Sequence, residues 1–79
     1  MDYEKDKVDE VVLALMWLVS YKDSLVTRAW KQFDWDSLDR LHEKGLISNH
    51  KSKAKSVVLS EEAVKLSEEL FKRYFGKNG

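Results

Sequence analysis

The chain has 79 residues, of which 43% are hydrophobic and 35% charged, and this balance suits one packed core with a solvated surface. It contains no cysteine, no proline and only three glycines, which excludes a disulfide framework and thiolate metal sites and favours helices. Lysine plus arginine and aspartate plus glutamate both number 14, so no net charge attracts nucleic acid or an anionic membrane. We expect residues 1–79 to form a single domain.

The longest uninterrupted apolar run, Val11 to Val19, is about half as long as the roughly 20 residues that a membrane-spanning helix needs. The residues before it are mostly charged, with acids among the lysines, unlike the basic start of a signal peptide. We therefore expect a cytoplasmic protein that does not span a membrane.

The first predicted helix is apolar on two faces. Leu13, Trp17 and Tyr21 recur at helical spacing on one face, opposite a longer apolar row. Such a helix is either central in its own domain or half of an oligomer interface, and we expect the central position. The longer row consists of Val8, Val11, Val12, Leu15, Leu18 and Val19.

A second helix is predicted to begin at Asp23 or Ser24, because both residues are good N-caps, and to reach about Phe33. It is short and contains the β-branched residues Val26 and Thr27, so its helicity must come from packing.

The third helix, residues 34–45, has the clearest signals. Asp34 or Asp36 caps its start, and Gly45 supplies the left-handed residue that ends many helices. Only a residue or two separates it from the second helix, which predicts a helix–tight turn–helix. Its expected buried stripe is Trp35, Leu38 and Leu41.

The hydrophobic period changes after Gly45. Two short β-prone runs flank a polar, lysine-rich stretch, which predicts a hairpin over residues 46–59 with a long tip. Ser60 then caps a last helix that runs to about Phe75.

This order of elements is that of a winged helix-turn-helix. The stretch from Leu38 to Leu70 resembles the second half of MarR-type winged helices, with Leu-x-x-Leu, Lys-Gly-Leu-Ile and Val-x-Leu-Ser-Glu-Glu in the same order. The whole chain also resembles a small bacterial family of winged-helix-like domains without an assigned function. The resemblance implies a mainly α fold with a small β-hairpin: three helices, a two-stranded wing and a C-terminal helix. Here the wing carries only lysines, and we expect one helix after it, where MarR-type regulators have extra terminal helices that build the dimer. The matching positions are Leu38, Leu41, Lys44, Gly45, Leu46, Ile47, Val57, Leu59, Ser60, Glu61 and Glu62.

The wing is the leading candidate for nucleic-acid binding. Lys51, Lys53 and Lys55 alternate, so in an extended conformation they project to one side. Three phosphate contacts give only weak binding, to which Arg28 and Lys31 of the second helix would add. The competing interpretation is a lysine-rich edge that prevents strand aggregation.

The third helix offers Arg40 as a base-reading residue, but the acids Asp36, Asp39 and Glu43 share its outward face. Exposed acids are repelled by DNA phosphates, so this helix could instead meet a basic protein partner.

No enzyme is predicted, because the sequence has no Ser/His/Asp set and no phosphate-binding loop. His42 and His50 lie on different elements without cysteine, so neither a metal nor another cofactor is expected. Core packing is the expected role of most aromatic residues. These are Trp17, Trp30, Phe33, Trp35, Phe71, Tyr74 and Phe75.

Two functions remain open: a small DNA-associated transcriptional regulator, or a protein–protein interaction module that uses the acidic third helix or the first helix. We also expect a homodimer, because so small a core rarely supplies more than about 3–5 kcal/mol without a staple. Its expected interface is an apolar patch, formed either by Leu13, Trp17 and Tyr21 on the first helix or by Phe71 and Phe75 on the last helix.

Overall fold

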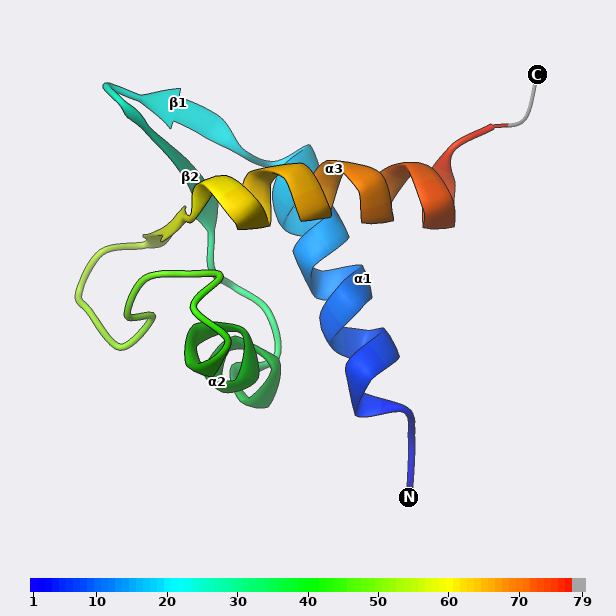
Figure 1. The fold of residues 1–79 in the computed structure, drawn as a ribbon. Helices are drawn as coiled ribbons and strands as arrows, with labels where there is room; N and C mark the ends of the chain where they lie inside the picture. Colours follow the sequence, from blue (N-terminus) through cyan, green and yellow to red (C-terminus); the bar gives the residue numbers. More distant parts are fainter. Residues whose placement is uncertain (78–79) are drawn as a thin grey trace.

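The computed structural model describes residues 1–77 and contains three helices and a three-stranded antiparallel sheet in the order β1-β2-β3. Helices α1 and α3 cross each other, and α2 lies beside the loop that leads into β3 (Figure 1). None of the helices in this part of the chain is long and apolar enough to cross a membrane. In chain order the elements are α1 (Lys5–Leu18), β1 (Tyr21–Asp23), β2 (Val26–Trp30), α2 (Trp35–Glu43), β3 (Ser56–Leu59) and α3 (Glu61–Phe75).

The central position of α1 is confirmed, since it contacts α3, α2 and β2. Both of its apolar faces are used: Val12 of the longer row is buried in the core, and on the other face Leu13 is buried and Trp17 packs on Phe71 of α3 with ring centroids 5.0 Å apart. The end of the longer row is not buried, because Leu18 and Val19 are exposed. The core consists of Val12, Leu13, Ala14, Met16, Ala29, Leu38, Leu41, Leu46, Ile47, Val57, Leu59, Ala63 and Leu70.

The predicted second helix is wrong: this segment forms the β1–β2 hairpin. Ser24, expected to cap a helix, has a φ of +60° in the turn, and the two strands pair from Asp23↔Val26 to Tyr21↔Arg28. The β-branched residues at the start of β2 suit a strand, and β2 gains a partner far along the chain in β3. The helix–tight turn–helix is therefore absent, and the sheet has three strands where two were expected.

The start and end of α2 are confirmed. Asp34 accepts a hydrogen bond from the Ser37 backbone N at 3.1 Å, and Gly45 has a φ of +75°. Leu38 and Leu41 are buried as expected, but Trp35 is half-exposed.

The predicted hairpin over residues 46–59 is present only at its base. Ile47 bridges Leu59, and the Ser48 N donates to the Val58 O at 2.9 Å. The main partner of β3 is β2, whose pairing runs from Thr27↔Leu59 to Trp30↔Ser56. The C-terminal helix α3 is confirmed, because the Ser60 Oγ accepts from the Ala63 N at 3.0 Å and the helix ends at Phe75.

Candidate nucleic-acid interface

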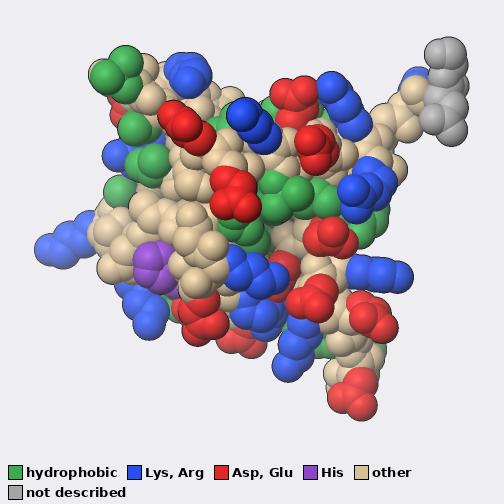
Figure 2. All heavy atoms as spheres, viewed as in Figure 1, with side chains coloured by type: hydrophobic (Ala, Val, Ile, Leu, Met, Phe, Trp, Pro, Cys, Tyr) green, Lys and Arg blue, Asp and Glu red, His purple; other side chains and the backbone are tan. Residues whose placement is uncertain are grey.

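The segment between α2 and β3 presents the predicted lysines to solvent. We call residues 49–55 the basic loop; it is built of turns and bends, so its lysines do not alternate along an extended strand. Lys51, Lys53 and Lys55 are all exposed. Figure 2 shows blue side chains around this loop, with the red acidic side chains of α2 next to it.

Lys31 fixes the basic loop by hydrogen bonds to the loop backbone. Its Nζ donates to the backbone oxygens of His50 at 2.6 Å and Ser52 at 2.7 Å, and its backbone N donates to the Lys55 O at 3.3 Å. The sequence suggested Lys31 as a phosphate contact, but the structure places its ammonium against two loop carbonyls. Its charge still adds to the positive potential of the loop.

His50 is the second anchor of the loop, a role that no sequence pattern indicated. Its side chain is buried, and its Nε2 lies 2.6 Å from Asp39 Oδ1. The edge of its ring meets Trp35, with centroids 4.7 Å apart, and His42 lies on another side at 5.8 Å. Because the Asp39 carboxylate accepts, Nε2 carries the donated proton, and Nδ1 is buried without a hydrogen-bond partner in the described residues.

The polar groups around His50 border a pocket of about 400 Å³. Asp39 and His42, one helical turn apart on α2, were the only sequence signal of this cluster. The described residues contain no group of three or more His, Cys, Asp or Glu side chains that could hold a metal ion. The pocket is lined by Asp39, His42, Glu43, Asn49, His50 and Lys51.

Arg40 does not offer its guanidinium to a ligand, because Asp9 of α1 occupies it. Its Nε and Nη2 donate to the two carboxylate oxygens of Asp9 at 2.6 and 2.8 Å. Burial by itself would raise the pKa of Asp9, but hydrogen bonding by Arg40 and Ser37 and the charges of Arg40 and Lys44 outweigh it and hold that pKa below its ordinary value. The hydrogen bond to Asp9 raises the pKa of Arg40 in turn. We assign Arg40 a structural role in place of base reading.

Arg28 lies across the face of the sheet that points away from the core. Its Nε donates to Asp23 Oδ2 at 3.1 Å and its Nη1 to the Ser56 Oγ at 3.2 Å, so the side chain bridges β1 to β3. Tyr21 pairs with Arg28 in the register, and Trp30 follows two residues along β2. Tyr21 and Trp30 are 44% and 49% exposed.

The exposed aromatic residues depart from the sequence prediction. Trp30, Trp35, Tyr74 and Phe75 are all half-exposed, whereas core packing was expected for them. Trp30 ends β2, Trp35 begins α2, and Tyr74 and Phe75 end α3, so each lies at the end of an element.

Of the residues expected at a dimer interface, Trp17, Phe71 and Phe75 form a row of contacting rings, with centroids 5.0 and 5.2 Å apart. Leu13 is a core residue and is wrong as an interface residue, because its side chain is 1% exposed. Trp17 and Phe71 pack on each other between α1 and α3, while Tyr21 and Phe75 keep about half of their surface in solvent. The homodimer itself stays a prediction.

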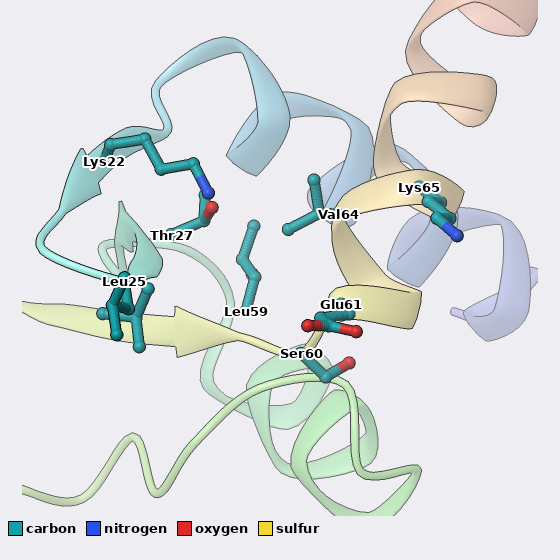
Figure 3. Close-up of a pocket in the computed structure, with 9 residues that line it drawn as sticks. Lys22, Leu25, Thr27, Leu59, Ser60, Glu61, Val64 and Lys65 are labelled. Carbon is teal, nitrogen blue, oxygen red and sulfur yellow. The ribbon is translucent and has the colours of Figure 1, made fainter.

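A second pocket, of about 450 Å³, lies between the β1–β2 hairpin and the first turns of α3. Figure 3 shows the side chains of Thr27, Leu59 and Val64 around this space, with Lys22 and Leu25 on the hairpin side. Leu25, at the turn of the hairpin, is 94% exposed, and Figure 2 shows green side chains along the hairpin. Leu25 and Val26 thus leave an apolar surface exposed at this end of the hairpin.

Comparisons with known proteins place the chain in a family. The model of the family described as "Domain of unknown function (DUF6429)" matches residues 4–77. The uncharacterized protein y4hR of Sinorhizobium fredii (strain NBRC 101917 / NGR234) is 49% identical over 75 residues, which cover 95% of this chain and 97% of the relative. No solved structure matches. Because the family model spans almost the whole chain, the protein belongs to the DUF6429 family.

Proposed function

We propose that the protein associates with DNA through phosphate contacts from the basic loop, as a small regulator. One observation supports this proposal: Lys51, Lys53 and Lys55 are all exposed. The loop that carries them is held in place by the hydrogen bonds of Lys31 and His50. A loop that is already ordered loses less conformational entropy when its side chains meet a ligand.

The surroundings of the loop favour weak, sequence-tolerant binding. Asp36 and Glu43 on α2 are exposed and repel phosphates, and Arg40 is paired with Asp9, so α2 has little to offer to base edges. One feature supports a relationship to the winged helices: a basic segment lies between α2 and β3.

Fluorescence anisotropy with a labelled mixed-sequence duplex at about 50 mM salt tests the proposal. We expect binding at or below about 100 μM that is lost steeply as salt rises. The triple variant K51A/K53A/K55A should bind more weakly and lower the magnitude of the log–log salt slope by up to about 2.7, or about 0.9 for each phosphate that is no longer neutralised.

The matched control is K5A/K7A/K77A, which removes the same charge from exposed lysines near the chain ends. If binding depended only on overall charge, the two triple variants would behave alike, and the basic loop would lose its assignment. Absence of wild-type binding at about 100 μM, both to this duplex and to a single strand of the same length, would reject the proposal.

The second candidate is a protein–protein interaction module without nucleic-acid binding. The sequence suggested that such a module uses either the first helix, α1, or the acidic predicted third helix, which is α2 in the structure. In α2 the acids Asp36 and Glu43 are exposed. The observation that favours it is the exposed apolar hairpin end with Leu25 beside the pocket under α3. It is the interpretation to pursue if no DNA binds.

A further inference from the structure

We infer that the DNA is single-stranded and that its bases stack on the open face of the sheet. This inference rests on the proposed function and names its ligand class. We call Tyr21, Arg28 and Trp30, with Ser56 of β3, the open face. It has the two components of a non-specific single-strand site: flat side chains for bases, and cations beside them for the backbone.

The register places the flat side chains next to one another. Tyr21 lies directly opposite Arg28, and Trp30 follows Arg28 two residues along the same strand, so all three belong to one face. The neighbouring position Ala29 is buried in the core with Val57, which shows that the helices cover the other face. Tyr21 and Trp30 are thus diagonal neighbours, and such positions lie about 7–8 Å apart, within reach of aromatic side chains.

Arg28 contributes a planar cation between the two aromatic rings. Its hydrogen bonds to Asp23 Oδ2 and Ser56 Oγ hold the guanidinium along the sheet. A guanidinium plane stacks on bases as an aromatic ring does. The same side chain pairs with Asp23, so the carboxylate nearest to this row is balanced by a positive charge.

The open face is continuous with the basic loop. Trp30 pairs with Ser56, and the residues just beyond this pair are joined by the bond from the Lys31 N to the Lys55 O. A strand whose bases lie over Tyr21 and Trp30 would thus bring its phosphates toward the lysines. In a duplex the base faces are hidden in the stack, and only its phosphates could use this surface.

The test compares a labelled single strand of about 12 nucleotides with a duplex of the same length, by anisotropy over a range of salt. We expect the single strand to bind more tightly. W30A should weaken single-strand binding about 5-fold to more than 100-fold, which is the range for loss of one stacked base. W30F, which keeps an aromatic ring, should retain most of the affinity.

The salt dependence separates stacking from charge. W30A removes no charge, so its affinity should fall equally at every salt concentration, whereas K51A/K53A/K55A should lower the slope by about 0.7 for each phosphate of a single strand that is no longer neutralised. F75A is the matched control, because Phe75 is 47% exposed, close to the 49% of Trp30, but lies at the last residue of α3 and not on the sheet. It should bind as the wild type does.

Three results would overturn the inference while leaving the proposed function intact: equal affinity for duplex and single strand, unchanged binding by W30A, or an F75A defect as large as that of W30A. Binding of neither probe would reject the proposed function itself. A doubled mass in light scattering that W30A reduces to 9.3 kDa would assign the open face to a second copy of the chain and also overturn the inference.

Discussion

Arg40 donates two hydrogen bonds to Asp9, a residue 31 positions earlier in the chain, and so ties α2 to α1. The carboxylate is 2% exposed, whereas the guanidinium is 24% exposed. Removing Arg40 and removing Asp9 should therefore have different effects on stability. Without Arg40 a buried charge has no partner, but without Asp9 the arginine can turn to water.

We predict that R40A lowers the free energy of unfolding more than D9N does, because it leaves the buried Asp9 carboxylate without its partner. D9N keeps the shape of the side chain and should cost less, about 1–2 kcal/mol. Urea denaturation followed by circular dichroism measures both. An equal or larger loss in D9N would contradict the asymmetry.

The depressed pKa of Asp9 predicts acid sensitivity. A carboxyl group whose pKa is lower in the folded than in the unfolded chain stabilises the fold above the unfolded value of about 3.9, and this contribution disappears as pH falls through the folded pKa. The urea midpoint of the wild type should thus drop between about pH 5 and the folded pKa. D9N should show a shallower decline over that interval, and parallel curves for the two proteins would refute the assignment.

Ser24 distinguishes the hairpin from the helix expected at this position. In the hairpin its φ of +60° is unfavourable for serine and free for glycine, so S24G should raise the free energy of unfolding by about 0.5–1 kcal/mol. For a domain of this size that is an increase in Tm of several degrees, about 2–8 °C. At a helix N-cap the same change would lower stability by a few tenths of a kcal/mol. A thermal melt distinguishes the two: Tm should rise in S24G if residue 24 lies in the hairpin turn, and fall if it caps a helix.

His50 should control the order of the basic loop. H50A removes the bond to Asp39 and the contact with Trp35, so we predict faster hydrogen exchange of the amides of residues 49–55 and weaker DNA binding, with α1 and α3 still protected. N49A, on the exposed side of the same loop, serves as the control, since it removes only a local bond to the Lys51 N. Unchanged exchange in H50A would show that Lys31 alone holds the loop.

The three helices of the structure could be predicted from the sequence alone, because their signals are local. A cap such as Asp34 or Ser60 bonds to a backbone N three residues on, and Gly45 takes its left-handed φ within the same turn. The lysines of the basic loop could be found for a similar reason: a run of lysines without an acid is visible in the sequence and has few ways to become buried.

Only the tertiary structure decided the conformation of residues 21–30. Their apolar spacing fits a helical stripe, but Ala29 pairs with Val57 of β3, and a hydrogen-bond partner so distant leaves no local trace. The same holds for Arg40, whose partner is on another helix, and for His50, whose burial depends on Asp39 and Trp35. Helix ends are set by bonds between near neighbours, whereas strand pairing and buried polar contacts are set by residues that meet only when the chain folds.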